Sequence, residues 1–229
     1  MSYAGPMRPF LNTVSSLLFC TFVVACGEPT ERDAINAVEP LEPNLAPAVE
    51  PVGEERYPEG VLSMVCGEEQ SEPSYHWCHA RGFVHAPIAD VFKTTRNVDV
   101  NVDRREIDTW VRRTDENPDA DFSYFVDVEL FNIISVEYTL KYGHNVEKGT
   151  LEEPELTWCL FDLTQASSVL EILRGSIVLR KIDDDITEYE YIEHLKAPLR
   201  DTEQVENTMR DIYADVLAHV HGEPLPDYN

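Results

Sequence analysis

The residues best suited to chemistry in this sequence are two cysteines and a small cluster of histidines. Cys66 and Cys78 lie twelve residues apart, and the run His76–His79 places two imidazoles and one thiol within four residues. Structural zinc sites use these ligand types but bring them in two separated pairs, which are missing here. On a strand, His76 and Cys78 share one face while His79 points to the other, so this run offers a metal two ligands at most. We therefore favour a Cys66–Cys78 disulfide over a zinc site and predict no bound metal.

The other cysteines and histidines do not form a recognisable catalytic set. Cys159 is expected within a strand, as a buried thiol. His219 and His221 are two residues apart on a predicted helix, which turns their side chains about 200° away from each other. The sequence contains no glycine-rich phosphate loop, no nucleophile elbow, no zinc-protease motif and no Cys-x-x-Cys pair. We therefore assign no catalytic residue and no cofactor, and we favour a binding protein over an enzyme.

The first 25 residues are typical of an export signal. Arg8 supplies a positive charge, and the apolar run Val14–Ala25 that follows has 12 residues, fewer than the ~20 of a membrane-spanning helix. The run Val23–Gly27 resembles a bacterial lipobox, which implies cleavage before Cys26 and diacylation of its thiol. An ordinary cleaved signal and an uncleaved anchor are the alternatives. Because two acyl chains hold a protein stably on a bilayer, we expect a lipid-anchored protein of the bacterial cell envelope, on the periplasmic face of the outer membrane or on the cell surface.

Residues 26–74 have the composition of a tether. Between Gly27 and Ser74 there are seven prolines and twelve acidic residues, with Arg32 and Arg56 as the only basic ones. Such a chain repels itself and favours extended conformations. We predict an acidic, proline-rich tether without fixed structure that stands the following domain off from the membrane.

The net charge excludes one class of partner. The chain has 43 Asp and Glu residues against 18 Lys and Arg, which gives a net charge of −25. Binding to a phosphate backbone is opposed by such a field. We therefore predict no nucleic-acid partner.

Residues 75–222 show the patterns of one folded domain, which a short tail at 223–229 follows. Alternating apolar residues predict strands over residues 75–85, 106–113, 122–131, 133–142, 156–163, 170–182 and 186–195. A short helix is expected to start at Pro87, and residues 97–105 could hold a second one. Residues 183–185 are three aspartates, which we interpret as a hairpin turn in preference to a cation site. A long amphipathic helix begins with a capping box at Asp201 and Gln204 and stops at Gly222.

This order of elements predicts an α+β fold in which a curved antiparallel sheet of about seven strands wraps around the C-terminal helix. It resembles the helix-grip superfamily, which includes START lipid-binding domains, polyketide cyclases and coenzyme-Q-binding proteins. The resemblance is carried by residues 83–92, the strand around Trp158, Gly175, the run Thr187–Tyr191 and the terminal helix. Together these span nearly the whole domain, although the polar stretch 97–105 departs from the family.

The resemblance implies a cavity between the sheet and the helix that takes an apolar ligand. The residues expected to line it are Tyr138, Leu140, Trp158, Tyr189 and Tyr191 from the sheet and Met209, Ile212, Tyr213 and Val216 from the helix. Large aromatic residues with polar tips suit a mostly apolar pocket, but the same stripes also build filled cores.

These observations lead to three hypotheses for the function. We favour a lipid-anchored envelope protein that binds a hydrophobic small molecule, such as a lipid, a quinone or a polyketide-like compound. The first alternative is a cyclase- or hydratase-type enzyme on an apolar substrate, with His194 or Tyr189 as a buried polar group at the end of the pocket. The second is a structural or interaction lipoprotein with a filled core.

Overall fold

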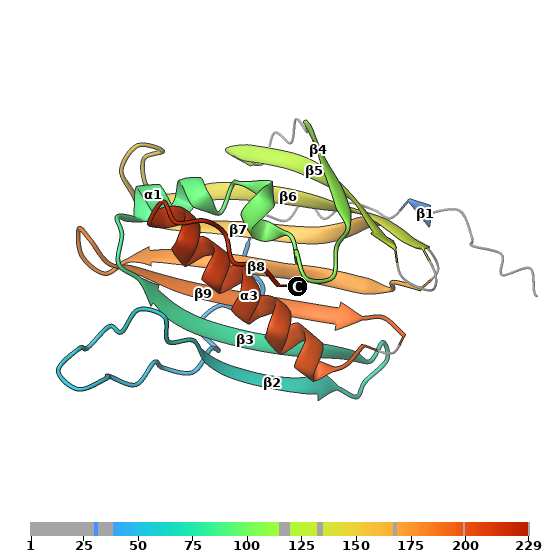
Figure 1. Cartoon of the computed structure of the whole chain (residues 1–229), viewed down its shortest axis with the longest axis horizontal. Helices are drawn as coiled ribbons and strands as arrows, with labels where there is room; N and C mark the ends of the chain where they lie inside the picture. Colours follow the sequence, from blue (N-terminus) through green and yellow to red (C-terminus); the bar gives the residue numbers. More distant parts are fainter. Residues whose placement is uncertain are drawn as a thin grey trace, which may run out of the picture.

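A computed structural model describes residues 30–31, 39–114, 120–131, 135–166, 169–198 and 200–228 (Figure 1). The predicted signal peptide and the predicted lipidation site, Cys26, lie outside the described residues. None of the helices in the described part is long and apolar enough to cross a membrane.

One antiparallel sheet contains all the strands of the described residues. The strands are β1 (Thr30–Glu31), β2 (Ser63–Glu69), β3 (Tyr75–Val84), β4 (Thr109–Thr114), β5 (Phe122–Phe131), β6 (Ser135–Gly149), β7 (Pro154–Ala166), β8 (Ile172–Lys181) and β9 (Thr187–Lys196). Their order in the sheet is β2-β3-β9-β8-β7-β6-β5-β4, and β1 pairs with β7. From β4 to β9 each strand pairs with its neighbour in sequence, and the pairing of β3 with β9 joins the start of the domain to its end.

In the described residues, three helices accompany the sheet: α1 (Ile88–Thr94), α2 (Val98–Asn101) and α3 (Thr202–Val220). Helix α3 lies across one face of the sheet, with α1 and α2 beside it (Figure 1). The predicted capping box is confirmed, since the Asp201 carboxylate accepts from the Gln204 backbone N–H and the Gln204 side chain accepts from the Asp201 N–H. The apolar stripe of α3 is buried against the sheet. This arrangement confirms the predicted α+β helix-grip fold.

The alternation of strand residues divides the sheet into two faces. In β9, Tyr191 and Glu193 belong to the inner face, on the side of α3, whereas Glu190, Ile192 and His194 belong to the outer face. Because the period of a strand is two, this division holds along each regular strand. All five of these side chains are buried, so both faces of β9 are covered.

Residues 39–59, which we call the outer segment, pack on the outer face at strands β3, β8 and β9. The Leu41 N–H donates to Ser176 Oγ at 3.0 Å, and the Asn44 N–H donates to Glu190 Oε1 at 2.7 Å. Ala46 and Val49 are buried there. The structure therefore differs from the predicted tether over residues 39–74, because this stretch packs on the domain or joins its sheet.

Strand β2 also lies within the stretch predicted as tether. It forms an edge of the sheet, where Cys66 stands directly opposite Cys78 of β3, and the two sulfurs are bonded. The predicted disulfide is thus confirmed, and it fixes the edge strand to its neighbour. The residues of β2 alternate only weakly between more and less exposed positions. The prolines and acidic residues around β2 therefore dominated the prediction for this stretch.

Candidate functional site

A cavity of about 510 Å³ lies between the inner face of the sheet and the N-terminal half of α3. Its walls are mostly apolar and include Val128, Leu130, Leu140, Phe161, Leu173 and Leu195. Helix α3 contributes Gln204, Thr208 and Ile212, and the connections around residues 101–107 and 197–200 complete the wall. Its volume is within the range of small-molecule pockets in proteins.

The cavity exists because α3 is held tightly to the sheet at its other half. The Tyr213 hydroxyl donates to the Phe83 carbonyl at 2.6 Å, and the Tyr213 ring lies over Gly82. A Cβ atom at Gly82 would lie 2.8 Å from Cζ of Tyr213, so only glycine allows this close approach. The helix is therefore fixed near Tyr213, while the side of its first turns that carries Gln204 and Thr208 borders the cavity.

A buried carboxyl group faces the cavity. Glu193 is 4% exposed, and its Oε2 accepts a hydrogen bond from the Tyr191 hydroxyl at 2.5 Å. Burial raises the pKa of Glu193 to about 7, and the negative charge of Asp103 adds to this rise, although the bond from Tyr191 opposes it. At neutral pH Glu193 is consequently divided between its protonated and ionised forms.

A second group of polar side chains lines the wall next to α3. Asp103 accepts from the Thr208 hydroxyl at 2.7 Å, and burial raises the pKa of this carboxyl. Arg200 donates to Glu106 at 2.8 Å. Both pairs belong to the cavity wall, so the site combines an apolar body with charged and hydrogen-bonding groups.

Tyr138 brings an uncommitted hydroxyl to this wall. Within the part of the chain that the structure describes, its hydroxyl makes no hydrogen bond. Burial raises the pKa of Tyr138, as do the carboxyl groups of Asp103 and Glu193, so the phenol stays protonated. It is thus a hydrogen-bond donor available to a ligand.

The structure places four of the nine predicted pocket residues on the cavity wall: Tyr138, Leu140, Tyr191 and Ile212. Four others lie in the packed core outside it: Tyr189, Met209, Tyr213 and Val216. The rings of Tyr189 and Tyr213 contact each other with centroids 5.5 Å apart. These four fill the region where the helix meets the sheet closely, which leaves no space for a ligand.

Two predicted positions require correction. Trp158 does not line the cavity, because its strand neighbour Cys159 lies on the inner face with Phe161, and Trp158 points to the outer face. His194 is likewise an outer-face residue next to the inward Glu193, so it cannot be the polar group at the end of the pocket. Tyr189 does have a buried hydroxyl without a hydrogen-bond partner in the described residues, but it lies outside the cavity.

The charged residues of the site were not predicted from the sequence. Glu193 carried a usable signal, since it continues the alternation Tyr189, Tyr191, Glu193 that faces the helix. A charged residue at an inward position of a strand is uncommon without a role. Asp103, Glu106 and Arg200 lie in connections between elements, where no periodicity indicates which way a side chain points.

Neither the scan of protein-family models nor the search of curated proteins found a match. Several solved structures are similar to this chain over part of its length. A STAR-related lipid transfer protein from Xanthomonas axonopodis is 10% identical, covers 70% of this chain and 93% of its own, and gives a TM-score of 0.49. The lipid transfer and protein localization domain of human StarD13 is 7% identical, with 70% and 83% covered and a TM-score of 0.48.

An aromatase/cyclase from a Streptomyces species, Zhui, is 10% identical, with 69% of this chain and 92% of its own covered and a TM-score of 0.43. At such identities, and with TM-scores below 0.5, these likenesses carry no argument about this chain. In this chain, the antiparallel strand order and the long capped helix across the inner face are themselves those of the START-like helix-grip fold that its sequence resembles.

Proposed function

We propose that this protein binds an apolar small molecule with a polar head, such as a lipid, a quinone or a polyketide-like compound, in the cavity beneath α3. The observation that carries the proposal is the cavity itself, about 510 Å³ in volume, with apolar walls and a few polar groups. A filled core, which was the structural alternative, has no such space. The hydroxyl of Tyr138 and the carboxyl of Glu193 are the groups to which the head of a ligand can hydrogen-bond.

Native mass spectrometry of the gently purified full chain, followed by extraction of bound compounds, tests this proposal. A Leu173→Trp substitution places a larger side chain in the cavity, because Leu173 lines it and is only partly buried. Leu151→Trp is the matched control, since Leu151 is an exposed loop residue. We expect the wild type and L151W to retain the same compound and L173W to lose it or bind it about tenfold more weakly. Empty wild-type protein that also takes up no added apolar compound would contradict the proposal.

A second candidate, an enzyme of cyclase or hydratase type, is favoured by one observation. Glu193 lines the cavity with a pKa of about 7, which suits a general acid or base at neutral pH. In that case Glu193→Gln keeps the hydrogen bond from Tyr191 but loses the proton transfer. The variant would then copurify with an unconverted substrate that differs from the compound held by the wild type. Because a ring closure without loss of water keeps the mass, the two compounds are compared by fragmentation as well as by mass. The same compound in both proteins contradicts the enzyme and leaves the binding function.

We also propose that a lipid on Cys26 holds the protein in the bacterial cell envelope. The lipobox-like run Val23–Gly27 after a short apolar stretch supports this. Cys26→Ser should abolish the mass of the acyl chains and the partition of the protein into detergent, whereas Cys20→Ser, within the predicted signal, should change neither. An unacylated wild-type chain with the signal still attached would instead support an uncleaved anchor.

A further inference from the structure

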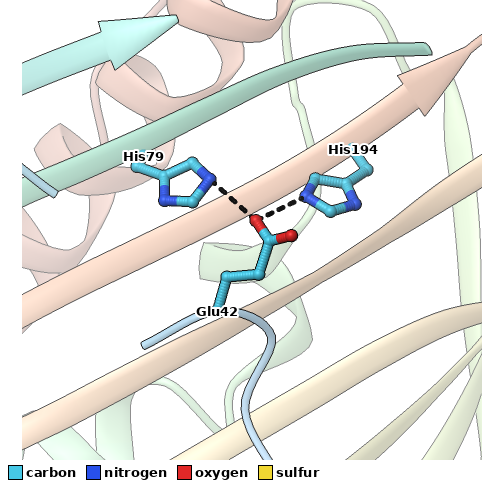
Figure 2. Close-up of side chains that lie close together, drawn as sticks. All are labelled: Glu42, His79 and His194. Carbon is cyan, nitrogen blue, oxygen red and sulfur yellow. Dashed lines mark ion pairs between the residues drawn. The ribbon is translucent and has the colours of Figure 1, made fainter. Parts of the chain in front are cut away.

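A group of three metal-ligating side chains lies on the outer face, away from the cavity. Figure 2 shows Glu42 of the outer segment placed between His79 of β3 and His194 of β9. The Glu42 Oε2 atom lies 3.2 Å from His79 Nε2 and 3.6 Å from His194 Nε2. All three ligand atoms are within 4.8 Å of one another.

The two separations from Glu42 match the edges of a metal coordination shell. With metal–nitrogen and metal–oxygen bonds of about 2.0 Å to 2.1 Å, two ligands of a tetrahedral zinc ion lie about 3.3 Å apart. The two nitrogen–oxygen distances from Glu42 bracket that value. One ion contacts all three atoms once the two Nε2 atoms, which lie within 4.8 Å of each other, also come to about this separation.

The imidazoles are held in place by the fold. Trp77 of β3 pairs with His194 of β9, and its ring meets the His79 ring edge-on with centroids 5.1 Å apart. The ring of Tyr75 stacks on His194 with centroids 4.7 Å apart. The two histidine side chains are 4% and 2% exposed, so aromatic contacts and burial keep both Nε2 atoms directed at Glu42. Preorganised ligands of this kind reduce the cost of binding a metal.

Charge and access are compatible with a cation. Glu42 itself is half exposed, which gives an ion a route from solvent. Glu190 is near His79 but is already paired with Arg81 and Arg180. Arg174 is the cation that faces His194. Burial lowers the pKa of both histidines, so that they are neutral at pH 7, which is the form that binds metal.

We propose that Glu42, His79 and His194 form a binding site for a divalent transition-metal ion of the zinc class. Two imidazoles and one carboxylate suit such an ion better than Ca²⁺ or Mg²⁺, which prefer all-oxygen ligands. Three protein ligands leave a fourth position for water. Because Glu42 belongs to the outer segment, the ion would fasten this segment to strands β3 and β9.

Metal binding is measured on the full chain, purified in mild detergent and freed of metal with a chelator. We expect one equivalent of Zn²⁺ to bind in competition with a chromophoric chelator, and one equivalent of Co²⁺ to give the visible absorption of a four-coordinate site. A large excess of Mg²⁺ should not displace either ion. A wild-type chain that takes up no Zn²⁺ or Co²⁺ overturns the proposal without reference to any variant.

Variants then locate the ion. His79→Gln, His194→Gln and Glu42→Gln should each weaken Zn²⁺ binding by about 100-fold or more. The control is His76→Gln, because His76 belongs to the same strand as His79 but bonds to Thr202 on the other side of the sheet. Equal affinity in all four variants would place the metal elsewhere and overturn the proposal. Glu42→Gln changes a half-exposed side chain, so it gives a result even if a histidine variant fails to fold.

Discussion

At the scale of single residues, Glu193 makes the stability of the fold depend on pH. Its pKa is 4.5 in an ordinary setting and about 7 in the folded chain, so the folded state holds this proton more tightly than the unfolded state. The contribution of Glu193 to the free energy of unfolding is therefore largest below pH 4.5. It falls by up to about 3 kcal/mol as the pH rises through about 7.

Glu193→Gln removes this dependence while it preserves an acceptor for Tyr191. We expect the free energy of unfolding of the variant, relative to wild type, to increase between pH 4 and pH 8, as measured by urea unfolding at a series of pH values. Glu152→Gln, in the exposed turn between β6 and β7, serves as the control and should run parallel to the wild type. A parallel profile for Glu193→Gln would contradict the raised pKa, because it would mean that this carboxyl binds its proton equally tightly in the folded and unfolded states.

At the scale of secondary-structure elements, the close contact between α3 and β3 fixes the position of the helix. Gly82→Ala would place a Cβ atom 2.8 Å from the Tyr213 ring, so the helix must move or the ring must turn. We expect a loss of about 1 to 3 kcal/mol in the free energy of unfolding in urea.

A glycine in an open position of the same sheet is the matched control. At Gly143 in β6, the nearest atom to a new Cβ is 3.7 Å away, so Gly143→Ala should change stability by less than about 0.5 kcal/mol. The contact explanation predicts that Tyr213→Leu, which removes the ring, reduces the cost of Gly82→Ala. If Gly82→Ala lowers the free energy of unfolding equally with and without the Tyr213 ring, the contact explanation is ruled out.

The elements also show how far the sequence alone reaches. Alternation and capping predicted β3 to β9 and α3, most of them with shifts of a few residues at their ends. The exception is β6, which runs to Gly149, seven residues beyond its predicted end. The predicted pocket residues came from these elements, but the sequence does not tell which side of α3 borders the cavity or where along the helix the cavity ends. Met209, beside the lining residue Thr208, and Val216, beyond the lining residue Ile212, were therefore placed in the pocket. The end of the cavity depends on the contact between Gly82 and Tyr213, two residues far apart in the chain.

Local sequence patterns also did not indicate which distant segments of the chain lie side by side. His79 and His194 meet because β3 pairs with β9, and Glu42 reaches them from a stretch whose composition indicated a tether. Local composition describes how a segment behaves by itself, whereas the outer segment is ordered by backbone bonds to Ser176 and Glu190.

At the scale of the whole molecule, the outer segment is part of the folded domain. It supplies backbone donors to Glu190, which is completely buried beneath it, and it covers the two histidines of the outer face. Removal of this cover would leave Glu190 with fewer hydrogen bonds and would expose apolar surface under Ala46 and Val49.

Two truncations distinguish a folded outer segment from a tether. Both are compared with a chain that lacks residues 1–26. In the first truncation residues 27–38 are removed as well, and we expect the midpoint of thermal unfolding to change little. Of these residues, Thr30 and Glu31 are the ones described as pairing with the sheet. Further removal of residues 27–59 should lower the midpoint by several degrees, because each kcal/mol lost shifts it by about 2 to 4 °C in a chain of this size. Equal midpoints for the two truncated chains would mean that residues 39–59 contribute nothing to stability, and the domain would then begin near β2 despite the contacts on its outer face.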